Sequence, residues 1–145
     1  GSLDPYERTI LEDLARWFAV NGEAVYGTRP WTIFGEGLPP DPEDANYSWN
    51  EEQKVARLPG QIRFTTRGPH LYATLLGRPA RDRLIIRTLA RKNGQGVIRQ
   101  VALLGFSGRV RWTHTAAGLC VILPASSGSD HTVSIRITGS GLRPV

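Results

Sequence analysis

Carboxylate side chains are the first candidates for catalysis in this chain, and they are distributed unevenly. The sequence contains 13 acidic residues, and only Asp82 and Asp130 follow Glu52. Hydrolysis of a glycosidic bond requires two carboxyl groups that flank the bond. The second half of the chain therefore has almost no acid chemistry of its own, and both remaining aspartates are predicted to lie in turns.

The three histidines are scattered over the sequence. His70, His114 and His131 fall on different predicted strands or turns, without the spacing of a metal site, so we expect no metal and no other cofactor. Ser129 and Asp130 directly precede His131, but adjacency in sequence is not the geometry of a catalytic triad. We interpret this tripeptide as a loop that runs into a strand.

The single cysteine, Cys120, lies in the apolar run 119–123. It has no partner for an internal disulfide, and its surroundings favour a buried free thiol over a reactive one. No apolar run reaches the roughly 18 residues that would span a bilayer, so no membrane partner is expected.

Positive charge invites a nucleic-acid hypothesis, since the formal net charge is +5. The arginines, however, are spread along the chain and alternate with apolar residues, as at Arg63, Arg99, Arg109 and Arg111. That alternation is typical of the solvated face of a sheet. We therefore expect no nucleic-acid partner.

These residues must be positioned by one helix and a series of strands. Asp4, Pro5 and Glu7 form a helix start with a capping box, and the helix is predicted to run to about Val20. Its apolar stripe needs a partner surface, for which we favour the chain's own sheets over a second copy of the chain. The stripe consists of Tyr6, Ile10, Leu11, Leu14, Trp17 and Phe18.

Residues 21–31 are predicted to end the helix and to continue the chain as an extended segment. Asn21-Gly22 suits the left-handed geometry that ends helices. Glu23 is the only carboxylate in this stretch, and we expect it to bond backbone amides in the turn in preference to meeting a substrate. Residues 32–60 are polar and rich in glycine and proline, which predicts a long loop.

From residue 61 onward the apolar residues alternate with a period of two, as at Ile62 and Phe64. About seven to eight short strands with frequent turns predict an antiparallel β-sandwich of two sheets over residues 61–145. Leu84–Leu89 is expected to be one strand, and Val97 is expected to share a face with Val101. The predicted interior comprises Val101, Leu103, Val110, Trp112, Leu119, Val121, Val133 and Ile135.

In its order of motifs the chain resembles the C-terminal region of the α-L-fucosidases of glycoside hydrolase family 29. The pieces that carry the resemblance are residues 14–20, 21–31, 34–37, 62–68, 71–73, 101–105, 111–113 and 118–124. Two positions depart from the family pattern: Gln61 replaces a frequent aspartate, and Arg78 replaces an aromatic residue before Pro79. The second departure weakens the case for sugar stacking at that surface.

The resemblance implies a domain division. Residues 1–31 would be a cloning scar (Gly1-Ser2), the last helix of a catalytic (β/α)8 barrel and its exit segment. Residues 32–60 would be the polar loop, and residues 61–145 the C-terminal β-sandwich. The family's catalytic carboxylates belong to barrel segments that are not in this sequence, so no catalytic residue can be assigned and this fragment is expected not to be an enzyme.

Three functions remain open, and no particular feature favours the third, a protein-interaction sandwich. The first is a non-catalytic C-terminal domain that braces the barrel of a retaining α-L-fucosidase or borders its substrate entrance, with the barrel as its partner. The second is an independent carbohydrate-binding module, for which Tyr47, Trp49 and Phe106 are the candidate glycan contacts. For Tyr47 and Trp49 we favour anchoring of the loop over sugar stacking. The localisation is not determined, although a secreted or periplasmic parent is expected from the resemblance.

Overall fold

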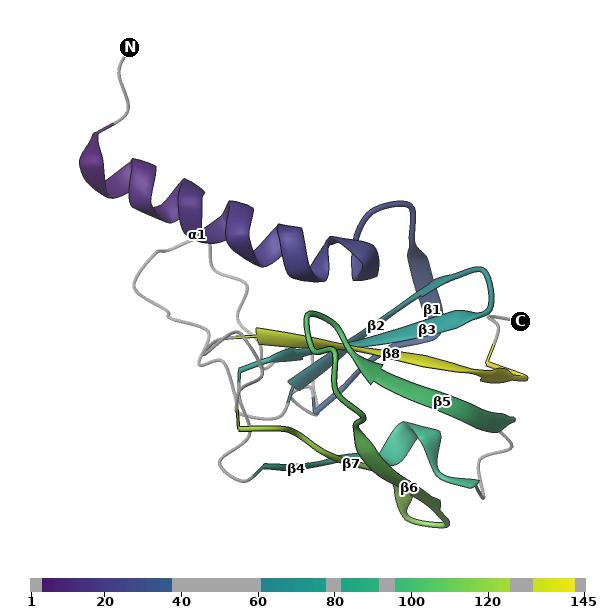
Figure 1. Cartoon of the computed structure of the whole chain (residues 1–145). Helices are drawn as coiled ribbons and strands as arrows, with labels where there is room; N and C mark the ends of the chain where they lie inside the picture. The colour runs from purple at the N-terminus through teal and green to yellow at the C-terminus, as the bar shows by residue number, and fades with distance from the viewer. Residues whose placement is uncertain (1–3, 38–60, 78–81, 92–95, 126–131, 143–145) are drawn as a thin grey trace.

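A computed structural model describes residues 4–37, 61–77, 82–91, 96–125 and 132–142. One long helix stands beside a two-layered β-sandwich (Figure 1). The helix α1 spans Pro5–Asn21, followed by a short 3-10 helix η1 at Gly22–Ala24. The described part of the chain contains no helix that is long and apolar enough to cross a membrane.

The predicted helix start is confirmed. The Asp4 side chain accepts hydrogen bonds from the amides of Tyr6 and Glu7, and the Glu7 side chain accepts one from the Asp4 amide. The helix end differs from the prediction: Gly22 has a right-handed φ of −56°, and the chain tightens into η1. The left-handed residue comes five positions later, where Gly27 has a φ of 67°.

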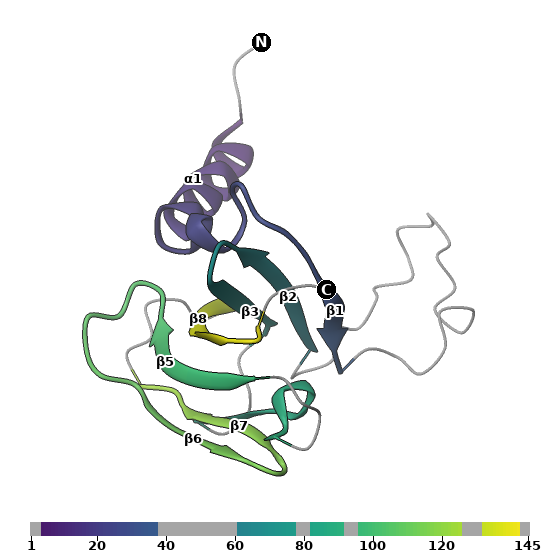
Figure 2. The same cartoon turned by 90° about the vertical axis from the view of Figure 1, so that its right-hand side faces the viewer.

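All strand pairs are antiparallel, as predicted, and they form two sheets. The five-stranded sheet has the order β1-β2-β3-β8-β5, and the three-stranded sheet has the order β4-β7-β6. The strands are β1 (Arg29–Glu36), β2 (Gln61–Arg67), β3 (His70–Leu76), β4 (Arg83–Ile86), β5 (Val97–Leu103), β6 (Arg111–Thr115), β7 (Gly118–Ile122) and β8 (Thr132–Ser140). Figure 2 shows the two layers from the side.

Three local expectations are corrected. Strand β1 continues to Glu36 and pairs with β2, so the expected loop does not begin at residue 32. The strand predicted over Leu84–Leu89 ends at Ile86, and Arg87–Leu89 forms the 3-10 helix η2. Val97 is 61% exposed whereas Ile98 is buried, because a register shift between Ile98 and Gln100 changes which side chains point inward.

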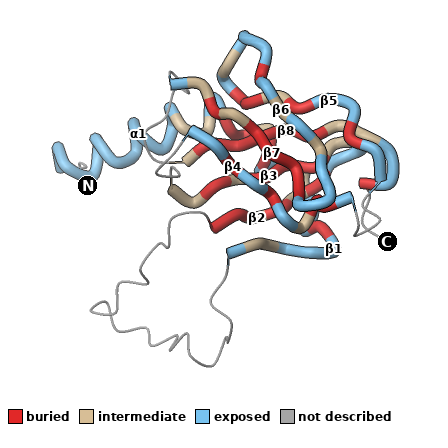
Figure 3. The backbone as a smooth tube through the Cα atoms, turned by 90° about the horizontal axis from the view of Figure 1, so that it is seen from below, coloured by how far each residue is buried: buried red, intermediate tan, exposed pale blue. Residues whose placement is uncertain are grey.

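The hydrophobic core lies between the two sheets, where most buried positions of the tube in Figure 3 are found. Seven of the eight predicted interior residues are buried, and the eighth, Trp112, is half-buried and packs against the core. Cys120 is a buried free thiol, as predicted, and its Sγ accepts a hydrogen bond from Arg83 Nε at 3.1 Å. Alternating side chains thus define the inner face of most strands.

Candidate functional site

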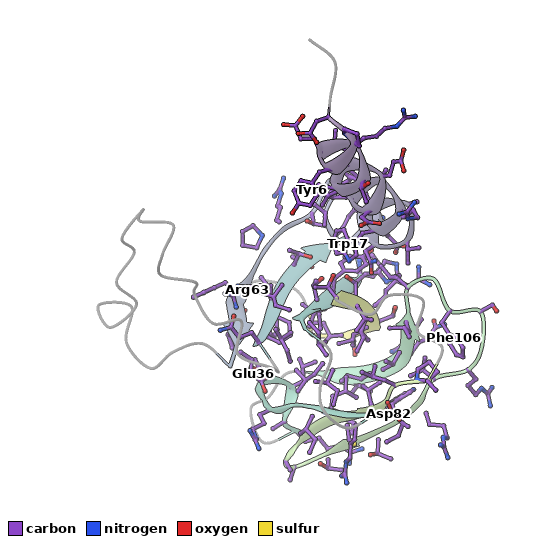
Figure 4. All side chains as sticks on the ribbon, turned by 90° about the vertical axis from the view of Figure 1, so that its left-hand side faces the viewer. Tyr6, Trp17, Glu36, Arg63, Asp82 and Phe106 are labelled. Atoms are coloured by element: carbon purple, nitrogen blue, oxygen red, sulfur yellow. The ribbon has the colours of Figure 1, made fainter. Side chains whose placement is uncertain are left out.

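Of the three candidate glycan contacts, only Phe106 belongs to the residues that the structure describes. Tyr47 and Trp49 lie outside them, so their predicted contacts stay predictions. Phe106 lies on the connection between β5 and β6, as Figure 4 shows, and its half-buried side chain packs against the core. The ring also lies over Gly108: a Cβ atom added there would come within 2.5 Å of the ring. Phe106 therefore packs against the backbone of the turn that follows it as well as against the core.

Phe106 borders a cleft of about 750 Å³, which we call the β5–β6 cleft. Strand β5 ends one sheet and β6 ends the other, so the cleft lies where both sheets present an edge. Its walls include the side chains of Arg99, Gln100, Phe106, Arg109, Arg111 and Trp112. The cleft combines three positive charges with two aromatic rings.

A second, smaller cavity of about 300 Å³ lies on the other side of the Arg109–Arg111 segment and includes Asp82 in its lining. Among the described residues, neither arginine forms an ion pair with the Asp82 carboxylate. The two guanidinium groups are exposed and remain available to a ligand in the β5–β6 cleft.

The Glu23 carboxylate forms a different kind of site, at the junction between the helix and the five-stranded sheet. Its Oε1 accepts a hydrogen bond from the Tyr72 hydroxyl at 2.9 Å and another from Arg136 Nη1 at 2.9 Å. Our expectation that Glu23 would bond the amides of its own turn is therefore wrong. The structural role that we favoured is nevertheless the one that these contacts support, since they link η1 to β3 and β8.

The electrostatics of this junction follow from its contacts. Burial alone would raise the pKa of Glu23, but hydrogen bonds from Arg136 and Tyr72 and the charges of Arg136 and Arg67 outweigh it and hold the pKa below its ordinary value. Burial raises the pKa of Tyr72, and the hydrogen bond and charge of Glu23 raise it further. At neutral pH Glu23 is thus a carboxylate and Tyr72 a neutral hydrogen-bond donor.

The last turn of α1 is joined to the sheet by two side-chain hydrogen bonds, and η1 by a third. The Trp17 indole donates to the Thr132 carbonyl at 3.4 Å, and Asn21 Oδ1 accepts from the Ser134 amide at 3.2 Å. The Thr65 hydroxyl donates to the Ala24 carbonyl at 2.7 Å. The end of the helix is therefore fixed on the five-stranded sheet.

The rest of the helix is not covered by the sandwich, contrary to our prediction. Tyr6 is 74% exposed, and Ile10, Leu11 and Leu14 are between 42% and 48% exposed. Only Trp17 and Phe18, in the last turn, are half-buried. Tyr6 lies in the first turn of α1, and Figure 4 shows its label farther from the strands than that of Trp17. We call Tyr6, Ile10, Leu11 and Leu14 the α1 apolar face.

The described histidines have ordinary structural contacts. His70 Nδ1 lies 2.9 Å from Thr138 Oγ1, and His114 Nε2 donates to the Leu89 carbonyl at 2.8 Å. His131 lies outside the described residues. Within the described ranges, no three His, Cys, Asp or Glu side chains are grouped so that they could hold a metal ion.

Sequence comparison identifies the family. The model of the α-L-fucosidase C-terminal domain matches residues 56–138, which is more than half of the chain. The chain belongs to this family. The match covers most of the sandwich, from β2 to the greater part of β8.

Curated relatives of this fucosidase C-terminal domain are much longer proteins. The tissue α-L-fucosidase of Bos taurus is 25% identical over 146 residues, and that of Homo sapiens is 22% identical over 144 residues. Each alignment covers 96% of this chain but only 25% and 26% of the respective relative. The chain thus spans about a quarter of their length.

Solved structures agree on the fold. The Thermotoga maritima α-fucosidase matches with a TM-score of 0.64 at 17% identity, and its complex with a mechanism-based inhibitor matches with a TM-score of 0.66. Both matches cover 95% of this chain and less than a third of the other chain. The helix and the sandwich therefore recur together in these structures.

Sequence reasoning missed two features of this fucosidase C-terminal domain. We interpreted Arg99, Arg109 and Arg111 as separate charges on a solvated face, because their convergence depends on which strands end the two sheets. The proximity of Arg109 and Arg111 to Phe106 and Trp112 in the sequence was the only available signal. The contacts of Glu23 with Arg136 and Tyr72 could not be recognised in the sequence either, since these residues lie 113 and 49 positions away along the chain.

Proposed function

We propose that this chain is a non-catalytic C-terminal domain that braces the catalytic (β/α)8 barrel of a retaining α-L-fucosidase. The parent enzyme would remove terminal α-L-fucose from glycans through a covalent fucosyl-enzyme intermediate. Family membership supports the assignment, and the longer relatives named tissue α-L-fucosidase leave room for a catalytic domain in the parent.

The observation that carries the bracing role is the α1 apolar face. Burial of one such side chain is worth roughly 1.5–3 kcal/mol, so four exposed members along a single helix indicate a surface that another part of the parent covers. The helix is fixed on the five-stranded sheet at its last turn, which presents this face in a defined direction. A barrel packed against it would be held rigidly to the sandwich.

The described carboxylates near the sheets already have structural partners. Glu23 is bound by Arg136 and Tyr72. Glu36 accepts hydrogen bonds from the amides of Arg87 and Thr88 at 2.9 and 2.8 Å, which joins the end of β1 to η2. These roles support a domain whose acidic groups stabilise the fold and leave hydrolysis to the parent's barrel.

The test compares this chain with the protein encoded by its complete gene. We expect the complete protein to release the chromophore from an aryl α-L-fucoside and the 145-residue chain to release none above a buffer blank. Turnover by the chain that survives repurification would overturn the non-catalytic assignment. A complete protein that is inactive and has no barrel sequence would overturn the parentage.

The bracing role is tested in the complete protein by Leu14→Asp, which places a charge on the α1 apolar face. We expect a lower melting temperature and, because the barrel loses its support, lower fucosidase activity after mild heating. Thr9→Asp is the matched control, since it adds the same charge at an exposed position about 140° around the helix from Leu14. Equal effects of the two substitutions would contradict a covered face at Leu14.

The second candidate function is an independent carbohydrate-binding module. The observation that favours it is the half-buried Phe106 ring at the β5–β6 cleft. A glycan-binding screen of this chain, repeated with Phe106→Ala and Trp49→Ala, separates it from a purely bracing role. Retained affinity that depends on either ring would support the module.

A further inference from the structure

The three arginines of the β5–β6 cleft come from separate parts of the chain. Arg99 lies in β5, at the register shift where Ile98 pairs with Gly139 and Gln100 pairs with Thr138. Such a shift inserts an extra residue and redirects its side chain. Arg109 and Arg111 reach the same cleft from the connection to β6 and from β6 itself.

No partner neutralises these charges in the part of the chain that is described. The ion pairs there join Arg8 to Glu12, Arg16 to Asp13 and Arg136 to Glu23, and none involves the arginines of the cleft. Three exposed guanidinium groups around one concave surface repel one another and attract an anion. An anionic ligand of matching size would relieve that repulsion.

The cleft also presents aromatic surface beside the charges. The Phe106 ring lies against Gly108, and Trp112 is half-buried on β6. Aromatic rings offer large, rigid apolar surfaces, against which the apolar face of a sugar ring can pack. Guanidinium groups bind carboxylate and other planar or tetrahedral oxyanions through paired N–H donors.

We propose that the β5–β6 cleft binds an anionic glycan, one that carries sulfate ester or carboxylate groups on its sugar rings. The carbohydrate part of this inference rests on the proposed function, and the anionic part rests on the three arginines. The site would hold a charged portion of a polymeric substrate while the parent's barrel acts on fucose. It would therefore restrict the parent to acidic fucose-containing glycans when the substrate is long.

The volume of about 750 Å³ suits a short oligosaccharide segment. A single-stranded nucleic acid is disfavoured, because it stacks successive bases on several aromatic platforms along a continuous basic groove. The described lining of the cleft contains two aromatic rings, too few for a run of stacked bases. Nucleic acid is nevertheless included as a probe, since its phosphates would also attract the arginines.

The experiment measures binding to the 145-residue chain by isothermal titration calorimetry at low salt. The probes are dextran sulfate, polygalacturonate, neutral dextran, inorganic sulfate and single-stranded oligothymidylate. We expect binding of dextran sulfate, polygalacturonate or both, and the stronger of the two identifies sulfate ester or carboxylate as the preferred group. Neutral dextran, inorganic sulfate and oligothymidylate should each bind at least about tenfold more weakly.

Two triple variants that lose the same charge distinguish binding at the β5–β6 cleft from general electrostatic attraction between the polyanion and a positively charged protein. Arg99→Gln, Arg109→Gln and Arg111→Gln together should weaken polyanion binding by about tenfold or more. Arg8→Gln, Arg29→Gln and Arg67→Gln together should change it less than about twofold. Arg29 and Arg67 lie on β1 and β2, at the other end of the five-stranded sheet from β5, and Arg8 lies in the exposed first half of α1. Thermal melting checks the fold, and single substitutions replace the triple variant if it melts early.

Equal losses in the two triple variants, or oligothymidylate binding as tight as that of the polysaccharides, would overturn the proposal. Binding that persists in the cleft variant would also overturn it. Hydrolysis of the aryl α-L-fucoside by the complete protein is measured in parallel and should be unchanged by the cleft substitutions. Absence of that hydrolysis in the unmodified protein would count against the proposed function, whereas loss of polyanion binding alone counts only against the cleft.

Discussion

The Glu23 carboxylate connects three elements at one point. It lies in η1, directly after the long helix, and it is bound by Tyr72 of β3 and Arg136 of β8. Tyr72 is completely buried, and its hydroxyl donates to Glu23 beside the charged Arg67, so loss of the carboxylate removes the acceptor that this buried hydroxyl uses. Glu23 therefore stabilises the position of the helix end on the sheet.

Neutralising this carboxylate should destabilise the chain in a pH-dependent way. We expect Glu23→Gln to lower the free energy of unfolding by about 1 kcal/mol at neutral pH. The pKa of Glu23 is lowered in the folded state, so its contribution is fully present above the ordinary value of 4.5 and is lost as the pH falls through the folded value. Urea unfolding at pH 7 and at pH 3.5 should therefore show a smaller difference in the free energy of unfolding between the unmodified chain and the variant at the lower pH.

Glu12→Gln is the matched control, because Glu12 forms an exposed ion pair with Arg8 within the helix. Such a pair contributes only about 0.3–0.5 kcal/mol. Equal destabilisation by the two substitutions at pH 7 would show that the Glu23 junction is no stronger than an ordinary surface pair.

At the scale of elements, the hairpin between β6 and β7 depends on one glycine. Gly118 has a positive φ of 144°, and a Cβ atom there would lie 2.5 Å from the Ile86 carbonyl oxygen. The backbones of β7 and β4 can therefore approach each other only without a side chain at this position. Gly68, in the β2–β3 hairpin, also has a positive φ, but no atom lies within 4 Å of its added Cβ.

The two glycines contrast a left-handed position in open space with a position that is both strained and crowded. Gly68→Ala should cost about 1–2 kcal/mol of stability, the cost of a left-handed conformation. Gly118→Ala should cost about 1–3 kcal/mol more, because the β4 backbone must also move. Chemical denaturation of both variants measures the difference, and equal losses would contradict the close approach at Ile86.

Local signals predicted most elements, and the exceptions have physical causes. The capping box at Asp4 and Glu7 and the alternation of Ile62 and Phe64 act within a few residues, so they could be recognised in the sequence. The register shift beside Ile98 could not, because it depends on how β5 pairs with β8. Strand β1 was missed because Gly35 and Pro30 oppose regular structure, although an edge position tolerates proline.

The candidate site was less predictable than the fold. Phe106 was recognised as an aromatic side chain in a turn, but its position beside Arg99 depends on the arrangement of two sheet edges. The same applies to Glu23, whose role was predicted as structural but with the wrong partners. Contacts between residues far apart in the sequence require the topology, which periodicity alone does not determine.

At the scale of the whole molecule, the contacts of the described residues that join the helix to the sandwich lie at the last turn of α1 and in η1. The α1 apolar face projects beyond that junction, as the exposed segment of the tube in Figure 3 shows. In the proposed parent the barrel covers this face. In the isolated chain the same face is available to a second copy, since a symmetric pair buries identical stripes against each other.

The isolated chain should therefore self-associate through α1. We expect sedimentation to show a concentration-dependent dimer that Leu14→Asp converts to a monomer, because a buried carboxylate without a partner is strongly unfavourable at an apolar interface. The melting temperature of the dilute monomer should barely change, since Leu14 is 47% exposed and does not contribute to the sandwich core. Trp17→Ala should lower that melting temperature, because the Trp17 indole bonds the Thr132 carbonyl and anchors the helix end. A monomer at every concentration, whose melting temperature falls with Leu14→Asp, would instead mean that the face folds back onto the sandwich.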